Sequence, residues 1–403
     1  MWKIIISCII VSLMAAQKAT FVNYKIFRIL PTTKMQADEL HRLEEIPDGF
    51  SFWEAPSFVG RNVDVMVAPH KFPEFYEIIT QTEVSYQVYI EDVQALIDET
   101  TLVNRSTTFD FTSFHTVDEI YENLDDLAKQ YPDKVQIIVG SKSYKGCQIK
   151  GVKVSFEANN PGIFIKGGIH AREWISPATV MYILHQLLIS KDANVRILAE
   201  SHDIYIFPVF NPDGYAHTTN RIWRKTRKPY GLFCIGADPN RNWDYEWVSV
   251  TGIPCSPTYA GTEPFSKVET KSMSKYIVTI SDKFYAYISF YSYSQLLMLP
   301  YGSTKKHLDN YNDLYNIGLK SIVALKQRYR TKYQIGNVAE TIYVCTGVSM
   351  DYIKGIYQKP IVYTYELGDR DRYGFLLSPN QIISFGEETL DSFVAMCQEA
   401  KIR

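Results

Sequence analysis

The sequence predicts an α/β domain with a mixed, twisted β-sheet flanked by helices on both faces, preceded by a ferredoxin-like antiparallel α+β module. The first observation is that short apolar runs alternate with helical patterns from about residue 106 onward. Buried strands separated by helices are typical of a sheet covered on both faces. The second observation is the order strand, helix, strand, strand, helix, strand between residues 22 and 99, which is the split βαβ arrangement.

The N-terminal module shows short strand and helix patterns that are clearly separated from one another. Its strands are expected in NYKIFRIL, SFWEA, NVDVMVA and SYQVYI, and its helices in MQADELHRLEEI, KFPEFYEIITQT and EDVQALIDE. It carries neither a cysteine nor a cluster of catalytic residue types, so by itself it indicates a binding or folding unit.

In the large domain the strands are expected in VQIIVGS, GVKVSF, GIFIKGGI, IYIFPVF, YAYISFY and IVYTYEL. Helical patterns lie between and after them, for example in TVDEIYENLDDLAKQY, PATVMYILHQLLIS and NDLYNIGLKSIVALKQRY. Functional groups of such domains gather in loops beyond the carboxyl ends of strands. HAREW, NPDGY, YSYSQ and YELGDRDRYG all follow such strand ends.

The first residues have the pattern of a signal peptide, which we place at residues 1–19. Lys3 precedes an apolar core from Ile4 to Ala16, and small residues follow it. The core is too short to cross a bilayer, and no other stretch is long and apolar enough to do so. We therefore expect a secreted, extracellular protein with no membrane partner.

A polar stretch, TTLVNRSTTFDFTS, separates the two folded parts. Arg105 within it is an exposed-looking site for a trypsin-like protease, and Asn104 opens a glycosylation sequon. The expected division is therefore the module over residues 20–105 and the large domain over residues 106–403.

The formal net charge of −2 argues against a general nucleic-acid binder, which needs a large excess of Lys and Arg. Of six cysteines, Cys8 lies in the signal peptide, and the odd number that remains implies a free thiol or an intermolecular bond. Cys234 and Cys255 bracket a loop-rich segment and are the best candidates for a disulfide. The others are interpreted as small buried apolar side chains: Cys147, Cys345 and Cys397.

The pentapeptide HAREW places His170 and Glu173 three positions apart, directly after an apolar run. This pair suits one face of a zinc ion, but zinc in a hydrolase normally takes three protein ligands and a water.

Seven motifs together resemble the A/B-type zinc metallocarboxypeptidases, the digestive procarboxypeptidase family, from about Tyr24 to the C-terminus. They occur in the family's order and spacing: GRNVDVMVAP, HAREWISPAT, NPDGY, NRIWRKTR, DPNRNWD, SYSQLLMLPYG and YTYELGDRDRYGFLLSPNQI. The resemblance implies a proenzyme, expected to be a monomer, whose module is an activation propeptide. It also implies one zinc ion per chain and peptide or protein C-termini as substrates.

The resemblance makes His170 and Glu173 two zinc ligands. Glu366 takes the position of the catalytic glutamate, which moves a proton from the zinc-bound water to the leaving amine. Arg224 takes the position that stabilises the oxyanion. Without the family motif, Glu366 reads as a surface carboxylate paired with Arg370 or Arg372, and NRIWRKTRK as a solvated charge run or a heparin patch.

Substrate-binding positions follow from the same motifs. A guanidinium forks onto a carboxylate, so Asn240 and Arg241 are expected to hold the substrate's C-terminal carboxylate, and Tyr343 to close over it. The remaining positions of this kind are Arg172 and Arg221, assigned to the same cationic wall, and Tyr293. The pocket for the last side chain falls on Met298, Gly302, Val338, Ile342, Cys345, Met350 and Thr364.

Met350 stands where members specific for basic residues carry an acid. A Lys or Arg side chain would be left uncompensated in this neutral pocket, so a preference for aliphatic and aromatic C-termini is expected.

Tyr291 stands where the family has its second histidine ligand, in YISFYSYSQ. Tyrosine binds zinc only as the phenolate, and its ordinary pKa is about 10. Three outcomes are open: weak zinc binding through Tyr291, a backbone shift that accommodates it, or loss of zinc. Two functional hypotheses follow, an altered zinc carboxypeptidase and a non-catalytic protein that binds peptide C-termini. A restored histidine at this position should return zinc binding and turnover.

Overall fold

The computed structural model describes residues 18–44, 48–56, 58–101, 108–217, 220–249, 251–368 and 372–400. Most of the expected signal peptide lies outside these residues, as do Asn104 and Arg105 of the expected linker. No helix within the described residues is both long and apolar enough to cross a bilayer.

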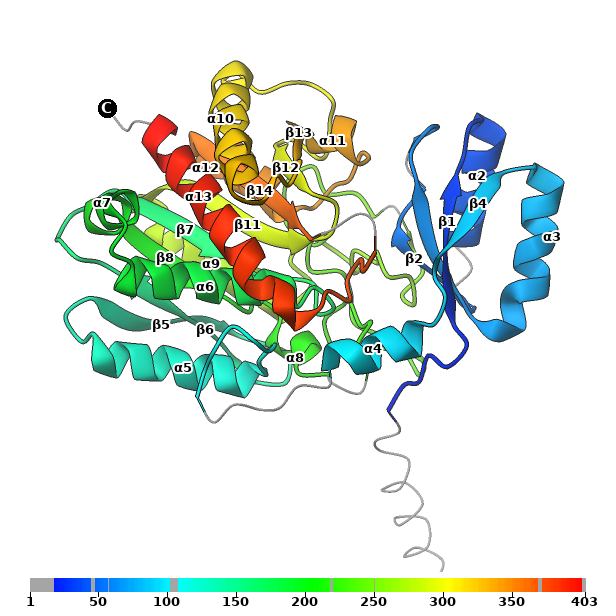
Figure 1. Ribbon diagram of the computed structural model, residues 1–403, viewed down its shortest axis with the longest axis horizontal. Coiled ribbons are helices and arrows are strands. Elements are labelled where there is room, and N and C mark those ends of the chain that lie inside the picture. Colours follow the sequence, from blue (N-terminus) through cyan, green and yellow to red (C-terminus); the bar gives the residue numbers. More distant parts are fainter. Residues whose placement is uncertain are drawn as a thin grey trace, which may run out of the picture.

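The N-terminal module is an antiparallel sheet of four strands in the order β2-β3-β1-β4, with two helices on one face (Figure 1). Its elements are β1 (Lys25–Leu30), α2 (Lys34–Glu44), β2 (Phe50–Glu54), β3 (Val63–Val67), a 3₁₀ turn (Pro69–Lys71), α3 (Phe72–Thr82), β4 (Ser85–Ile90) and α4 (Val93–Thr101). Phe27 and Ile29 of β1 pack with Leu40 and Phe75 of the helices in a core of their own. The predicted split βαβ order is confirmed.

The large domain is built on a mixed sheet of eight strands in the order β13-β12-β14-β11-β7-β8-β6-β5. The four strands β8, β7, β11 and β14 run parallel at its centre, while β6 and β5 on one side add antiparallel pairs. The strands are β5 (Val135–Lys142), β6 (Gln148–Val154), β7 (Gly162–Lys166), β8 (Asp203–Phe207), β11 (Phe284–Ser292), β12 (Leu296–Leu299), β13 (Gln334–Asn337) and β14 (Ile361–Leu367). A separate two-stranded ribbon joins β9 (Pro229–Tyr230) and β10 (Cys234–Ile235).

Helices cover both faces of this sheet, as predicted (Figure 1). One face packs against α5 (Val117–Gln130), α6 (Ile175–Ile189), α7 (Ala193–Ser201), α10 (Tyr311–Tyr329) and α13 (Ile382–Ala400). The other face packs against α9 (Val268–Ile280) and α12 (Ser349–Tyr357). The short elements are α8 (Pro212–Tyr215), α11 (Val338–Thr341) and a 3₁₀ turn (Pro379–Gln381).

Strand alternation decides which side chains meet. Ile163 and Ile165 of β7 belong to the core beneath α6 and α13, whereas Phe164 belongs to the core beneath α9 and α12. Successive side chains of a strand point to opposite faces, so Lys166 shares the face of Phe164. Tyr291 of β11 lies on that same face. Because β7 and β11 are parallel, with Ser289 opposite Lys166, these two side chains end at one edge of the sheet.

The N-terminal module lies against the large domain through the sheet face that its own helices leave open (Figure 1). Trp53 of β2 packs on the ring of Phe375, with centroids 5.1 Å apart, and forms an edge contact with Tyr293. Asp64 of β3 is fully buried and accepts a hydrogen bond from the Tyr293 hydroxyl at 2.7 Å. Arg28 holds the same carboxylate with two bonds of 2.7 Å.

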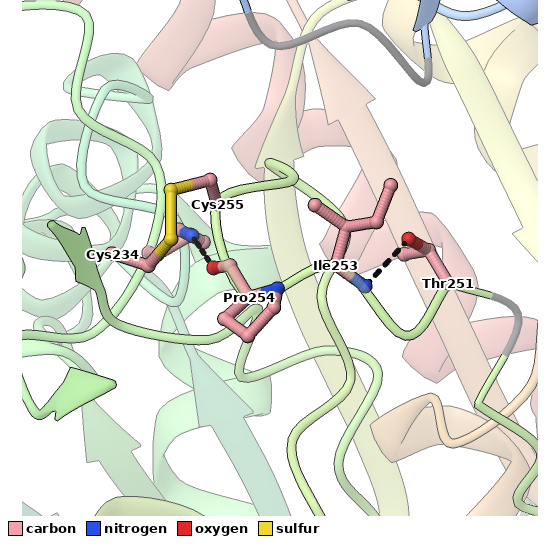
Figure 2. Close-up of a disulfide and its surroundings, with 6 residues drawn as sticks. Cys234, Thr251, Ile253, Pro254 and Cys255 are labelled. Atoms are coloured by element: carbon pink, nitrogen blue, oxygen red, sulfur yellow. Dashed lines mark hydrogen bonds between the residues drawn. A yellow bond between two sulfur atoms is a disulfide. The ribbon is translucent and has the colours of Figure 1, made fainter. Parts of the chain in front are cut away.

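Cys234 and Cys255 form a disulfide (Figure 2). In the loop before it, Ile253 donates its amide to the Thr251 hydroxyl at 3.2 Å, and Lys225 donates to the Pro254 carbonyl at 2.8 Å. Cys147, Cys345 and Cys397 are free thiols, of which Cys345 is buried and the other two are partly buried.

Candidate active site

The HAREW loop leaves the sheet at the carboxyl end of β7. Gly168 makes the turn possible, because its φ is +61° and a Cβ there would lie 3.0 Å from the Pro208 carbonyl oxygen. The loop brings His170 Nδ1 to 2.7 Å from Glu173 Oε1, and both side chains are almost completely buried. The amide of Ser292, at the end of β11, donates to Glu173 Oε2 at 3.2 Å.

Asp238 connects this loop to the basic segment. Its Oδ1 lies 3.2 Å from His170 Nε2 and accepts the Asn240 amide at 2.8 Å, while its Oδ2 accepts two bonds from Arg224 at 2.7 and 3.0 Å. Burial alone would raise the pKa of Asp238, but the charges of Arg224, His170 and Arg241 outweigh it and hold that pKa well below its usual value. Asp238 is therefore a fixed buried anion that orients three of the predicted site residues.

Arg241 and Tyr343 face each other across the cleft. The Arg241 Nη2 donates to the Tyr343 hydroxyl at 2.6 Å, and its Nη1 donates to the Asn240 carbonyl at 2.7 Å. The Asn240 side chain accepts the amide of Ser349 at 3.0 Å, which ties the loop to the start of α12.

Arg172 lines the cleft, but Arg221 does not. Arg221 donates to the Arg172 carbonyl at 2.7 Å and to the Phe375 carbonyl at 2.9 Å, with its guanidinium 3.9 Å from the Trp174 ring centroid. It borders a different cavity, of about 420 Å³, between the two domains. Arg221 thus braces the loop that carries Arg172, instead of joining the cationic wall expected from the sequence.

Glu366 of β14 stands directly opposite Tyr291 of β11 in the parallel register, and both line the cleft. Burial raises the pKa of Glu366 well above its usual value, Glu173 adds to the effect and Arg224 opposes it. This placement disfavours the alternative of a surface carboxylate. Arg370, one of the two partners in that alternative, lies outside the described residues.

The cleft is a cavity of about 130 Å³ with an apolar end and a covered entrance. Six of the expected pocket residues line it: Met298, Val338, Ile342, Cys345, Met350 and Thr364. Gly302 lies just behind, where a Cβ would come within 3.0 Å of Cys345 Sγ. The N-terminal module contributes lining residues of its own, namely Glu44, Phe52, Trp53, Glu54 and Ala55.

At the remaining position of the cleft, Tyr291 is paired with a buried lysine. Its hydroxyl oxygen accepts from Lys166 Nζ at 2.9 Å and lies 3.3 Å from the Ser349 hydroxyl. Burial raises the pKa of Tyr291 well above its usual range, with Tyr287 adding to the effect. Burial also lowers the pKa of Lys166 to about 7, although Glu173 opposes that shift. Lys166 and Asp238 were not among the site residues predicted from the sequence, although a lysine that ends an apolar strand just before HAREW is a signal of a buried polar group.

Comparison with known proteins decides the family. The profile described as zinc carboxypeptidase matches residues 120–392, and that of the carboxypeptidase activation peptide matches residues 27–100. The chain belongs to the zinc carboxypeptidase family. Zinc carboxypeptidase A 1 of Anopheles gambiae is 44% identical over 99% of this chain and 94% of the relative. Carboxypeptidase A2 of Mus musculus is 36% identical over 92% of both chains.

Solved structures of the family have the same fold. The carboxypeptidase A from Helicoverpa armigera superimposes with a TM-score of 0.85 over 94% of this chain and 98% of that one, at 26% identity. The chain is a procarboxypeptidase by family and domain content, with an activation peptide ahead of the hydrolase domain. Zinc is the cofactor of this family.

The side chains fit zinc at two positions and not at a third. His170 Nδ1 and Glu173 Oε1 lie 2.7 Å apart, which brings together an imidazole nitrogen and a carboxylate oxygen, both of which are ligand types that zinc prefers. The third position holds a phenol that already accepts a hydrogen bond from an ammonium group. Among the described residues, no three His, Cys, Asp or Glu side chains are grouped so as to hold a metal.

Proposed function

We propose that the activated protein removes aliphatic and aromatic residues from the C-termini of peptides. The observation that carries the proposal is a single cleft that joins the Arg241–Tyr343 pair, the partly buried Glu366 and an apolar end. A site of this kind offers fixed positive charge for a terminal carboxylate and a neutral pocket for the side chain beside it.

Several side chains of the cleft bind different parts of the peptide substrate. Arg241 and Asn240 hold the terminal carboxylate, and Tyr343, already within 2.6 Å of the guanidinium, closes over it. Arg172 extends the positive wall along the peptide, with its guanidinium 3.9 Å from the Phe375 ring centroid. Arg221 keeps that loop in place.

Glu366 and Arg224 act on the scissile bond. Glu366, with its pKa raised mainly by burial, accepts a proton from the attacking water and passes it to the leaving amine. Arg224, fixed by Asp238, offers N–H groups to the developing oxyanion. His170 and Glu173 are the residues that would hold zinc, which would supply a Lewis acid and lower the pKa of a water molecule.

Specificity follows from the charge of the pocket. Met350, Met298 and Val338 are buried and present no charge to the substrate's last side chain. Asp351, next to Met350, is fully buried and accepts the amides of Gly302 and Ser303, so its carboxylate is already engaged. A cationic side chain would therefore enter without a partner.

The N-terminal module keeps the cleft covered until it is removed. Its Trp53 packs over Phe375, and its Asp64 engages Tyr293, which we assign to substrate binding. We propose residues 1–19 as the signal peptide of a secreted protein, residues 20–105 as the activation segment and residues 106–403 as the enzyme. Cleavage by a trypsin-like protease after Arg105 would release the module.

Trypsin-trimmed protein tests the proposal. With zinc added in excess, peptides ending in Phe or Leu should be shortened at least about tenfold faster than the same peptides ending in Arg, since one fitted methylene in an apolar pocket is worth roughly 1–3 kcal/mol. The matched control is the C-terminally amidated peptide, which removes the charge that Arg241 holds. Faster release of Arg overturns the specificity. Tight binding of free C-termini without release at saturating zinc shows a non-catalytic peptide-binding protein instead.

A further inference from the structure

Lys166 is a buried cation within the active site. Its side chain is 1% exposed, and its Nζ has one hydrogen bond, to the Tyr291 hydroxyl oxygen at 2.9 Å. No carboxylate within the described ranges lies within 4.0 Å of this ammonium group, so it has no salt bridge. Its other neighbours are aromatic, with the rings of Tyr291 and Phe210 centred 4.8 and 5.3 Å from Nζ.

The position of this lysine is set by the sheet and not by a mobile side chain. Lys166 ends β7, and Ser289 lies opposite it in β11, so Tyr291 is two residues further along on the same face. The HAREW loop starts immediately after Lys166, and Glu173 acts electrostatically on its ammonium group. The lysine thus contacts the side chain at the third-ligand position and is close enough to Glu173 for their charges to interact.

Two features of the pair oppose a zinc ion. The Tyr291 hydroxyl oxygen already accepts from Lys166, so a metal ion at that atom would have to displace the ammonium group. In addition, a protonated Lys166 and a zinc ion in one buried site repel each other strongly, because the interior screens charge far less than water does.

We propose that Lys166 and Tyr291 form one unit that replaces the third zinc ligand and competes with zinc for the site. The ammonium group supplies positive charge beside Glu173, which a divalent cation supplies in a three-ligand site. Zinc then binds through His170 and Glu173 at reduced affinity. The inference rests on the proposed function only in taking those two side chains as zinc ligands.

The contact between Lys166 and Tyr291 determines which substitutions can restore high zinc affinity. Tyr291→His alone leaves the lysine in place, so the new imidazole meets an ammonium group where the phenol did. The two substitutions are therefore coupled, as expected for side chains in direct contact. Full affinity requires that both residues change, which differs from the expectation that the restored histidine suffices.

The test is a zinc titration of the intact proenzyme by equilibrium dialysis, with bound zinc counted per chain. Because loss of even a neighbouring group costs about 10–100-fold in metal affinity, wild-type protein should hold well below one zinc per chain after dialysis. Lys166→Met should raise zinc affinity by about tenfold or more, and Tyr291→His by less than that. The double variant Lys166→Met/Tyr291→His should gain more than the product of the two single effects.

Lys267 provides the matched control. It is also 1% exposed, with its Nζ 4.0 Å from the Tyr230 ring centroid and no hydrogen bond found for it in the described part of the chain. Lys267→Met removes a buried lysine elsewhere and should leave zinc affinity unchanged.

Lys166→Gln separates charge from hydrogen bonding, because its amide can still donate to Tyr291 without a positive charge. It also serves if the Met variant does not fold, which thermal unfolding of each zinc-free variant reveals. Wild-type zinc affinity in Lys166→Gln overturns the proposal, as does full occupancy of wild-type protein or full repair by Tyr291→His alone. Because zinc is counted and no peptide is used, these results are independent of whether the enzyme releases C-terminal residues.

Discussion

The buried charged side chains at the two ends of the cleft differ in the partners that surround them. At the carboxylate-binding end, Asp238 is surrounded by Arg224, His170 and the Asn240 amide, which offset its negative charge. At the zinc end, Lys166 has a neutral phenol as its only hydrogen-bond partner in the described structure. The residues predicted to bind the peptide are thus held by charge pairs, whereas the position predicted for the third zinc ligand holds a phenol that is paired with a lysine.

Asp238→Asn should have the largest effect. Removal of one partner from a buried ion pair leaves uncompensated charge and costs about 3–5 kcal/mol, so the free energy of unfolding should fall by that amount in urea titration. Lys166→Met, which removes a buried charge that has no ionic partner, should leave stability unchanged or raise it. Equal losses in the two variants would contradict the contrast between the two ends.

Arg241→Met should mainly weaken peptide binding. The guanidinium donates to Tyr343 and lies within reach of a substrate carboxylate, and loss of a buried, hydrogen-bonded charge partner costs about 2–4 kcal/mol in affinity. Calorimetry on trypsin-trimmed protein should show this loss for a peptide with a free C-terminus. The amidated peptide should bind wild-type and variant alike. A similar loss for both peptides would place the carboxylate elsewhere.

A comparison of Asp351 with Asp238 shows how much the cations around Asp238 contribute to stability. Both carboxyl groups are fully buried, but Asp351 accepts the backbone amides of Gly302 and Ser303, and burial raises its pKa from 3.8 to about 6. Between these values the folded state retains a proton that the unfolded state has released, so stability should fall as pH rises from about 4 to about 6.

The expected size of this loss is about 1–3 kcal/mol, since one pKa unit corresponds to about 1.4 kcal/mol. Asp351→Asn should flatten the pH dependence of the urea midpoint within that window. Asp238, whose pKa is depressed, contributes in the opposite direction, so Asp238→Asn should not flatten it. An unchanged slope in Asp351→Asn would assign the titration to another group.

The sequence by itself determined the two-part organisation and the fold class, and its resemblance to the zinc carboxypeptidases named many of the residues that line the cleft. Strand and helix patterns depend on local periodicity, and the motifs of the family lie in loops whose positions follow from strand ends. His170, Glu173, Arg224, Arg241 and Glu366 could be named because they occupy positions of the family's motifs. The tyrosine at position 291 could also be recognised, because it stands where the family's motif has a histidine.

Only the tertiary structure decided how these residues are supported. Lys166 and Tyr291 are separated by 125 positions in the chain and meet because β7 and β11 are neighbours in the sheet. Asp238 gathers its partners from two loops, and Arg221 turns from the cleft to brace Arg172. Such contacts depend on which strands pair and which loops cross. Local sequence periodicity carries no information about either, so the pairing of Lys166 with Tyr291 was decided by the tertiary structure.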